Sequence, residues 1–373
     1  MAVPVLAAAA RAVNHLADRT PSQLRAVVGF DGFVDEILSV VARRIDADRF
    51  EPVPTIADFG RRVAAAAGYS TNFELVPRQM KLGGNGPIMG LALAKSGMAV
   101  TCIGAMGVPE MHPVFAELAD VAHVISIANP GHTQALEFSD GKLMLGKPGN
   151  LRDVTWEKLL TRVGRDRLIE LCAKAHVLAL VNWTQLPHMT DIWRRFLDEV
   201  APALPGERRG RLAFFDLADP HKRSGKEIQE AVDVLAGFSR YFRTVLGLNR
   251  KEAAEVGRAL GLEDSTKLGA DLEGAARALA AAVAVDAVVI HPVDRAAWCG
   301  SGTYVEVEGP YTPEPRLTTG AGDNFNAGCC LGLALGLDAQ DSLTMGVATS
   351  GYYVRHGGSP TFRDLVAFLS RGA

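Results

Sequence analysis

The sequence predicts an α/β fold in which a mostly parallel β-sheet lies between two layers of helices, with a small β-lid added. Three observations support this prediction. Short runs of β-branched and aromatic residues alternate with longer helical segments along the chain. The runs are apolar almost throughout, which is typical of strands buried on both faces of a parallel sheet. Two other stretches alternate apolar and polar residues, as a half-exposed antiparallel sheet does.

The bulk composition favours one large domain with a small-molecule partner. At 373 residues with 48% hydrophobic content, the chain can bury a large core, and no repeat or long polar linker divides it. We therefore expect a single domain over residues 1–373. The net charge is −3 with acidic and basic residues interspersed, which leaves no basic patch for nucleic acid or an anionic membrane.

Cysteine usage and the apolar segments favour a cytoplasmic location. The five cysteines stand in apolar or Gly/Ala-rich contexts without a Cys-x-x-Cys pair, so we expect reduced core residues. The N-terminal apolar run is Ala-rich, short and not preceded by a basic residue, which favours an amphipathic helix over a signal peptide. The longest apolar runs carry Arg or Asp within the length that a membrane helix needs.

The regular elements follow in order. We expect strands in six apolar runs, 25–30, 99–106, 176–183, 211–218, 241–249 and 286–292. Helices are expected in the segments Pro87–Gly97, Met189–Val200, Gly225–Phe238, Arg250–Leu260 and Leu272–Val285. Residues 32–80 and 129–148 break this rhythm, and 131–147 contain a Ser-Asp-Gly turn typical of an antiparallel hairpin. A lid built from these two segments accounts for both.

The sharpest motif is a glycine turn at 317–328, LTTGAGDNFNAG. Such a turn at the start of a helix leaves backbone N–H groups unpaired, and the helix dipole adds positive charge, so it can bind a phosphate. Amides of Ala321, Gly322 and Asp323 would stabilise charge on that phosphate. A carboxylate at Asp323 would repel a bound phosphate, so it is a poor choice for a site that only binds an anion. Its presence is explained if it accepts the proton of a hydroxyl that attacks the phosphate. The alternative is that Asp323 only caps the helix.

The same turn resembles the late motif Asp-Thr-Thr-Gly-Ala-Gly-Asp of the phosphofructokinase-B, or ribokinase-like, family of carbohydrate and nucleoside kinases. Thr318, Thr319 and the residues to Asp323 match it in order. The resemblance implies a ribokinase-like three-layer α/β/α sandwich that uses ATP and Mg²⁺. It also implies that Asp323 is the general base and that Gly320, Ala321 and Gly322 form the anion hole. Leu317 stands where the family usually has Asp, which puts activation by potassium in doubt.

A second glycine cluster, KLGGNGPIMG, begins at Lys81. Gly84, Gly86 and Gly90 lie near the spacing of a dinucleotide fingerprint, but no acidic residue follows about 20 positions on. The segment resembles the family's Gly-Gly-Asn turn, which holds substrate hydroxyls. The resemblance therefore implies that Gly84 and Asn85 bind the substrate, while a plain turn and helix cap remains the alternative.

Two acidic residues follow the first strand, in VVGFDGFVDEIL. Asp31 and Asp35 lie near its carboxyl end, where α/β sheets bind ligands, and ionised carboxylates accept hydrogen bonds from vicinal hydroxyls. Family members carry a substrate-binding Asp shortly after this strand. Asp35 is the closer match, and Asp31 stays a candidate because the spacing from Gly29 is one residue longer than in the family. A solvated acidic loop is the alternative.

Asn249 and Glu252 are three residues apart at the start of an expected helix. This spacing suits a helix cap in which the Asn side chain accepts from the Glu amide and the Glu side chain reaches back to the Asn amide. The resembled family has Asn-x-x-Glu here and uses it to organise magnesium, largely through water, so both roles can coexist. The stretch FFDLADPHKRS, with Asp216, Asp219 and Arg223, resembles a further family motif more loosely.

The nucleotide side shows the clearest departure from the family. Members usually have Val-Thr-x-Gly after the strand at 286–292, where this chain has residues His291–Asp294 and no glycine. The nucleotide contacts therefore differ, or the chain belongs to a divergent branch. The segment ATSGYYVRHGGSP resembles the helix beside the family's adenine pocket, which implies that Ala348 and Gly351, together with Thr319 and Asn249, bind ATP.

Together these motifs predict an ATP-dependent phosphotransferase that acts on a hydroxyl of a sugar or sugar-like molecule. The alternative is a non-catalytic or regulatory relative that binds sugars or nucleosides, in which the His291 region no longer holds ATP. A nucleotide-dependent oxidoreductase, based on the Gly84 cluster alone, is the third interpretation. Some relatives pair their lids between two chains, so a homodimer is a further expectation.

Overall fold

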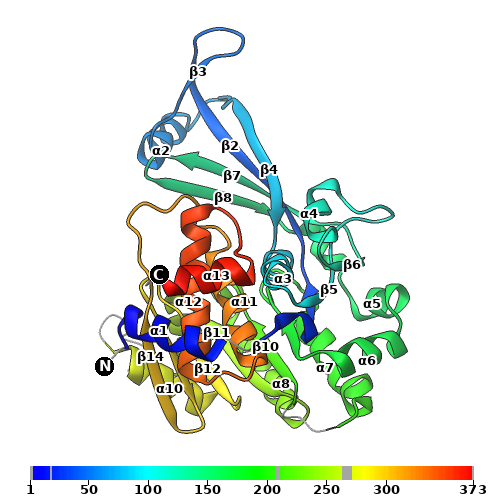
Figure 1. Cartoon of the computed structure of the whole chain (residues 1–373). Coiled ribbons are helices and arrows are strands. Elements are labelled where there is room, and N and C mark those ends of the chain that lie inside the picture. Colours follow the sequence, from blue (N-terminus) through cyan, green and yellow to red (C-terminus); the bar gives the residue numbers. More distant parts are fainter. Residues whose placement is uncertain (1–2, 17–18, 207–209, 263–270, 372–373) are drawn as a thin grey trace.

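A nine-stranded sheet forms the centre of the protein in the computed structural model, which describes residues 3–16, 19–206, 210–262 and 271–371 (Figure 1). The strand order is β14-β13-β12-β11-β10-β9-β1-β5-β6. The sheet is parallel from β12 to β6, and β13 and β14 form an antiparallel edge. The strands are β1 (Arg25–Phe30), β5 (Ala99–Gly104), β6 (His123–Ser126), β9 (Val177–Leu180), β10 (Leu212–Asp216), β11 (Arg243–Leu248), β12 (Ala287–Ile290), β13 (Arg295–Gly300) and β14 (Thr303–Glu308). The six apolar runs are therefore the parallel strands that the sequence predicts, and β6 is an addition.

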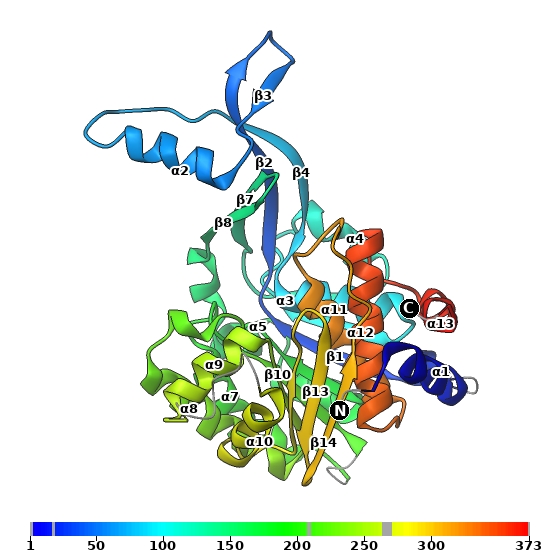
Figure 2. The ribbon, with the colours of Figure 1, turned by 90° about the vertical axis from the view of Figure 1, so that its left-hand side faces the viewer.

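Helices cover both faces of this sheet, as Figures 1 and 2 show. One layer consists of α5 (Trp156–Arg162), α6 (Arg165–Lys174), α7 (Met189–Glu199), α8 (Gly225–Gly237), α9 (Arg250–Ala259) and α10 (Leu272–Ala282). The other consists of α1 (Val5–Leu16), α3 (Asn85–Lys95), α4 (Ala116–Ala119), α11 (Ala321–Ala334), α12 (Ala339–His356) and α13 (Phe362–Ser370). The predicted three-layer α/β/α arrangement is confirmed.

The apolar strands fill two separate cores. In β1, Val27 packs in the core under the α7 layer, whereas Ala26 and Val28 pack in the core under the α11 layer. Successive side chains of a strand point to opposite faces, so a continuous apolar run is needed when both faces are covered. A shift of one residue would exchange the two faces, and the double burial therefore fixes the register of the sheet.

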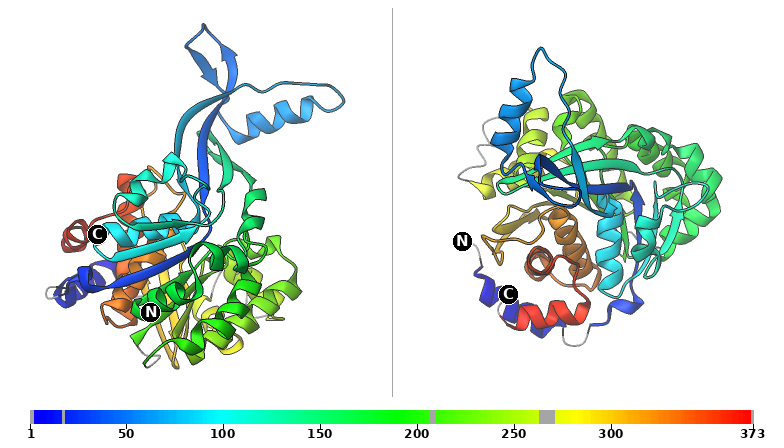
Figure 3. Two further views of the ribbon diagram at one scale, coloured as in Figure 1. Left: turned by 90° about the vertical axis from the view of Figure 1, so that its right-hand side faces the viewer. Right: turned by 90° about the horizontal axis from the view of Figure 1, so that it is seen from above.

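A second, five-stranded sheet, here called the lid, projects from one end of the body (Figures 1 and 3). Its strands are β2 (Phe33–Arg44), β3 (Phe50–Pro52), β4 (Leu75–Gly83), β7 (Gly131–Phe138) and β8 (Gly141–Lys147). β7 and β8 form the antiparallel hairpin that the Ser-Asp-Gly turn predicts. β2 continues the chain directly from β1, so the lid is joined to an inner strand of the large sheet.

Helix α2 (Ile56–Ala65) lies within the segment that the sequence assigns to lid strands. The Oγ1 of Thr55 caps its first turn by accepting a hydrogen bond from the amide of Asp58 at 3.0 Å. Phe59 packs against the rings of Phe73 and Phe138, with centroid distances of 5.1 and 5.6 Å. This aromatic cluster attaches α2 to the lid. Figure 2 shows the helix beside the lid strands.

The parallel strands end at one edge of the sheet, beneath the lid. Asp31, Asn182, Asp216, Asn249 and His291 all lie at the carboxyl ends of strands or just beyond them. Polar residues at this edge are where open α/β sheets place their ligands. No helix in the described parts of the chain is long and apolar enough to span a membrane.

The five cysteines, Cys102, Cys172, Cys299, Cys329 and Cys330, are all free and buried. The expectation that the cysteines are core residues is therefore confirmed.

Candidate active site

A cavity of about 370 Å³ lies between the lid and the carboxyl edge of the sheet. We call it the lid-side cavity. Residues from three places line it: strand ends of the body, lid strands β2, β7 and β8, and the first residues of α3 and α11. The lining residues that carry functional groups are Asp35, Asn85, Thr133, Asn182, Gln185, Asp219, Lys222, Asn249, Glu252, Thr319 and Asp323.

A second cavity, of about 320 Å³, lies on the other side of the α11 N-terminus. We call it the body-side cavity. It is lined by the end of β12 with His291 and Pro292, by the segment 309–318, and by one face of α12. Its walls are more apolar than those of the lid-side cavity, as suits a flat aromatic ligand group.

One turn separates the two cavities. Thr319, Gly320 and Asp323 line the lid-side cavity, whereas Thr318, Ala321 and Gly322 line the body-side cavity. Asn249 lines both. Groups bound in the two cavities would therefore meet at the residues of this turn, 318–323.

The turn opens a helix N-terminus without a side-chain cap. Gly320 is the N-cap residue of α11, with a φ of 91°, a conformation that L side chains rarely adopt. The Ala321 amide donates to the Thr318 carbonyl at 3.1 Å. Of the three amides that the sequence proposes as donors, those of Gly322 and Asp323 are left without an acceptor in the described chain. These two N–H groups can bind an anion, supported by the helix dipole.

Asp323 is a buried carboxylate beside this turn. It is the third residue of α11 rather than its cap, and its Oδ1 accepts a hydrogen bond from Asn85 Nδ2 at 2.8 Å. Burial raises the pKa of Asp323 well above its ordinary value, and the carboxylates of Asp216 and Asp31 raise it further. The bond from Asn85 opposes this rise. The capping interpretation of Asp323 is therefore wrong, and a group with a raised pKa is suited to accept a proton.

Asp31 is placed differently from Asp323, because the protein itself occupies its oxygens. It accepts bonds from the amides of Asn85 (2.8 Å) and Gly86 (2.7 Å) and from Asn182 Nδ2 (2.6 Å). Burial raises its pKa to about 6. Asp31 is 1% exposed and does not line the lid-side cavity. It positions the Gly84 turn, so we do not retain it as a substrate contact.

The Gly84 turn leaves no room for a dinucleotide phosphate. A Cβ atom at Gly84 would lie 2.9 Å from Asp31 Oδ2, and one at Gly86 would lie 2.7 Å from Asp31 Oδ1. The Asp31 carboxylate thus fills the anion site at the N-terminus of α3. The oxidoreductase interpretation is wrong for this reason, while Gly84 and Asn85 do line the lid-side cavity.

Asp35 reaches the lid-side cavity from lid strand β2. Its neighbours across the lid are Lys81 on β4 and Thr133 on β7. Burial raises its pKa, and a hydrogen bond from Thr133 and the charge of Lys81 oppose the rise. Asp35 is thus a buried hydrogen-bond acceptor that lines the cavity, as a residue that binds sugar hydroxyls requires.

Asn249 and Glu252 form a capping box at the start of α9. Asn249 Oδ1 accepts from the Glu252 amide at 2.9 Å, and Glu252 Oε2 accepts from the Asn249 amide at 2.9 Å. Glu252 Oε1 also accepts from the Asp219 amide at 3.1 Å. Burial raises the pKa of Glu252. Each carboxylate oxygen can accept a second hydrogen bond, and Glu252 lines the lid-side cavity, so the cap does not exclude a further role.

Asp216 lies one strand away and is equally buried. It accepts from the Ala218 amide at 2.8 Å and from Asn326 Nδ2 at 2.7 Å. Burial and the charge of Glu252 raise its pKa well above the ordinary value. Arg223 instead donates to the carbonyls of Thr184 and Leu186 and to Glu227, and it does not line either cavity.

On the body-side cavity, the face of α12 carries Val347, Ser350, Gly351 and Val354. This spacing is one face of a helix. Ala348 points into the core under the α11 layer, so we do not retain it as a nucleotide contact, whereas Gly351 lines the cavity. His291 stacks on Phe325 with a centroid distance of 4.6 Å, and burial lowers its pKa to about 4.

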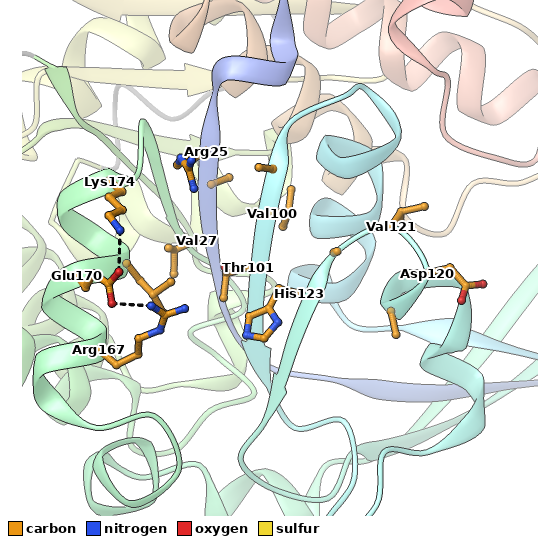
Figure 4. Close-up of a pocket in the computed structure, with 15 residues that line it drawn as sticks. Arg25, Val27, Val100, Thr101, Asp120, Val121, His123, Arg167, Glu170 and Lys174 are labelled. Carbon is orange, nitrogen blue, oxygen red and sulfur yellow. Dashed lines mark hydrogen bonds and ion pairs between the residues drawn. The ribbon is translucent and has the colours of Figure 1, made fainter.

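A wider cavity, of about 600 Å³, lies at the opposite edge of the sheet (Figure 4). It is lined by the first residues of β1, β5 and β6 and by α6. Glu170 accepts bonds there from Arg167 at 2.5 Å and Lys174 at 2.7 Å, which lower its pKa to about 2. The three charged groups that α6 contributes are thus paired with one another. The cavity lies at the amino ends of the strands, away from the glycine turns.

Comparison with known proteins shows the family of the chain. The sequence model of the prokaryotic ketohexokinase family matches residues 5–371. The chain belongs to this family. It is 32% identical over 365 residues to the ketohexokinase of Haloferax volcanii, covering 96% of this chain and 95% of that protein. The family resemblance that the sequence predicts is confirmed, and the protein is a carbohydrate kinase.

Solved structures with lower identity share the fold. Arabidopsis thaliana ribokinase, in complex with ribose and ATP, superposes with a TM-score of 0.63 at 17% identity, over 93% of this chain and 98% of that chain. The adenosine kinase of Sinorhizobium meliloti gives a TM-score of 0.63 at 15% identity, over 95% and 100%. The predicted ribokinase-like fold is confirmed.

Sequence reasoning missed several residues of the site. Asn182, which binds Asp31 and lines the lid-side cavity, follows an apolar strand directly, and that position could have identified it. Lys142 donates from the lid to Thr319 Oγ1. No local pattern indicates that contact, because the two residues meet only after the lid folds over the body.

Proposed function

We propose that the protein transfers the γ-phosphoryl group of ATP to a hydroxyl group of a ketohexose. The observation that carries this proposal is the turn 318–323, whose residues line two cavities and whose free amides lie beside a buried carboxylate. A nucleotide in the body-side cavity would direct its phosphates towards the amides of Gly322 and Asp323. A sugar in the lid-side cavity would present a hydroxyl to Asp323.

The reaction needs one proton acceptor and charge stabilisation. The sugar oxygen forms a bond to Pγ, the bond from Pγ to the bridging oxygen of ADP breaks, and the hydroxyl proton passes to Asp323. The raised pKa of Asp323 makes it a better acceptor than an exposed aspartate at neutral pH. The amides of Gly322 and Asp323 stabilise the charge on the equatorial oxygens.

Asp35 and Asn85 are suited to orient the sugar. Asp35 can accept hydrogen bonds from two hydroxyls, and the Asn85 carboxamide can accept from a hydroxyl through its oxygen while its Nδ2 donates to Asp323. Such contacts fix which hydroxyl faces the base, and correct positioning supplies a large part of the rate in phosphoryl transfer.

Magnesium fits the acidic residues around the turn. Besides burial, the charge of Glu252 raises the pKa of Asp216, and the charges of Asp219 and Glu255 raise the pKa of Glu252. A cation would relieve this repulsion. No group of three or more His, Cys, Asp or Glu within the described ranges is arranged to hold a metal directly. Glu252 and Asp216 would therefore hold Mg²⁺ through water, with ATP oxygens as the direct ligands. The ion would neutralise phosphate charge.

The proposal is tested with a substrate panel. Purified protein with Mg²⁺ and ATP is offered fructose, tagatose and sorbose beside glucose, ribose and adenosine, while ADP release is followed and the product is identified by phosphorus NMR. We expect kcat/KM for at least one ketohexose to exceed the values for the other classes by about tenfold, the size of one or two lost hydrogen bonds.

Sugar binding detected by calorimetry without sugar-dependent ADP release would contradict the proposal and favour the non-catalytic alternative. Preferential phosphorylation of adenosine or ribose would retain the kinase and overturn the ketohexose assignment.

A further inference from the structure

Lys142 connects the lid to the turn 318–323. It lies on β8, and its ammonium donates to Thr319 Oγ1, a residue that lines the lid-side cavity. Glu137 stands directly opposite Lys142 in the β7–β8 ladder, yet the two form no ion pair. The side chain therefore extends to the body although a cross-strand carboxylate is adjacent.

A hydroxyl is an unusual sole partner for a half-buried lysine. Four other lysines in the described chain, in contrast, bind a carboxylate directly, namely Lys95, Lys174, Lys222 and Lys251. Lys142 has three N–H donors, and Thr319 accepts one of them. Two donors of a cation thus remain available next to the cavity, which suits an anionic ligand group.

The surroundings of the turn create a need for such a cation. Five buried carboxylates lie in or near the lid-side cavity, Asp31, Asp35, Asp216, Glu252 and Asp323. A phosphoryl group that moves into this region meets their combined negative charge. Lys222, which also lines the cavity, is already paired with Asp219. Lys142 is the lysine that touches the turn where the phosphoryl group would pass.

We propose that Lys142 binds an oxygen of the phosphoryl group during transfer, so that the lid supplies a catalytic cation only when it lies over the turn. This role rests on the proposed kinase function. Lys142 neither gains nor loses a proton: the sugar oxygen bonds to Pγ, the bond from Pγ to the bridging oxygen breaks, and Asp323 takes the proton. The ammonium stabilises the oxygens of the group in passage.

The bond to Thr319 explains how the lysine is held ready. Tyr353 donates to the Thr319 carbonyl at 2.7 Å, so the backbone of this residue is anchored to α12 while its hydroxyl is anchored to the lid. The lysine and the amides of Gly322 and Asp323 then approach the phosphoryl group from different elements. Opening of the lid would withdraw the cation and leave the amides in place.

The test compares Lys142→Met with Lys147→Met. Lys147 is exposed on the same strand, five residues further and therefore on its other face. We expect Lys142→Met to lower kcat about 10²-fold, the effect of losing one donor to a developing charge, with KM for the sugar nearly unchanged. Lys147→Met should keep wild-type kcat. A Lys142→Met enzyme with kcat within threefold of wild type would overturn the proposal.

A second variant and a binding measurement exclude a purely structural role. Methylammonium should restore part of the kcat of Lys142→Ala, because a soluble cation can enter the space of the missing side chain. Absence of rescue in a variant with wild-type Tm would count against the role.

ADP affinity is also measured by calorimetry with and without aluminium fluoride, a mimic of the phosphoryl group in transfer.

The wild-type protein should bind ADP more tightly with aluminium fluoride than without it. In Lys142→Met, the factor by which aluminium fluoride increases ADP affinity should be smaller by about tenfold or more. An equal gain in both proteins would contradict the proposed contact. This measurement needs no sugar turnover. If the substrate panel fails but the gain depends on Lys142, the ketohexose assignment falls and the lysine role stands.

Discussion

The N-termini of α3 and α11 are built alike and used differently. Each begins at a glycine with positive φ, 93° at Gly84 and 91° at Gly320, and neither has a side-chain cap. At α3 the carboxylate of Asp31 accepts the first two amides. At α11 the amides of Gly322 and Asp323 have no acceptor within the described chain, and the adjacent carboxylate, Asp323, is turned to Asn85.

The comparison shows that a glycine turn at a helix start is not by itself a ligand site. Such a turn can bind a ligand anion only where no carboxylate of the protein already accepts the hydrogen bonds of its amides. Asp31 makes the α3 turn a rigid part of the scaffold, which holds Asn85 against Asp323. The α11 turn stays open for the phosphates of ATP. The α3 turn therefore positions Asn85, whose side chain binds Asp323 beside the α11 turn.

The variant with the largest expected effect tests whether Asp323 acts as a base or only stabilises the start of α11. Asp323→Asn should lower kcat about 10³- to 10⁴-fold, because the amide cannot accept the proton, while ATP and sugar affinity change little. Asp58→Asn is the matched control, since Asp58 is also the third residue of a helix, in the lid helix α2. It should leave kcat unchanged in steady-state assays. Near-wild-type turnover of Asp323→Asn would refute its role as base.

The next largest effect concerns the α3 turn. Asp31→Ala removes the acceptor of three buried donors, on Asn85, Gly86 and Asn182. We expect a loss of about 3 kcal/mol in the free energy of unfolding, measured by urea denaturation, since unsatisfied buried donors are costly. A loss below 1 kcal/mol, on the same scale, would show that water replaces the carboxylate and that the turn is not held by Asp31.

A smaller effect tests the shape of the open turn. A Cβ at Gly320 would lie 2.9 Å from Tyr353 Oη, whereas one at Gly336, also at positive φ, would meet nothing within 4 Å. Both alanine variants should lose about 1 kcal/mol of stability from backbone strain. Only Gly320→Ala should also lower kcat, by roughly tenfold through displacement of the turn. Equal kcat values in both variants would contradict this use of the turn.

The smallest effect is a shift in pH dependence. The bond from Asn85 lowers the pKa of Asp323, so Asn85→Ala should raise it further. The base must be ionised, and kcat/KM therefore falls as the pH drops through this pKa. In the variant the fall should begin at higher pH than in wild type, as pH-rate profiles would show. A shift to lower pH would mean that another group sets the acidic limb.

Much of the fold could be predicted because its signals are local. Continuous apolar runs such as that of β1 indicate strands buried on two faces, and the Ser-Asp-Gly turn indicates the β7–β8 hairpin. Helix α2 was missed because its ten residues, at 56–65, bury no side chain fully, and the contacts that hold it, the cluster around Phe59 and the bond from the Ile56 amide to Asp140, are tertiary. The order of strands in the sheet has no local signal either.

The site residues that belong to a local motif could be predicted from the sequence. Those whose role depends on contacts with distant parts of the chain could not. The turn before Asp323 contains its own glycines, and the capping box of Asn249 and Glu252 is a three-residue spacing. The role of Asp31 depends on Asn182, far along the chain, and that of Lys142 depends on how the lid lies over Thr319. Ala348 was misplaced because only the packing of α12 shows which of its faces meets the cavity.

The most direct test of the central claim is a crystal structure of the protein with a non-hydrolysable ATP analogue and a ketohexose. We expect the terminal phosphate to lie about 3 Å from the amide nitrogens of Gly322 and Asp323, and one sugar hydroxyl to donate to the Asp323 carboxylate at a similar distance. A terminal phosphate bound away from the α11 N-terminus, or a sugar with no hydroxyl near Asp323, would contradict the account.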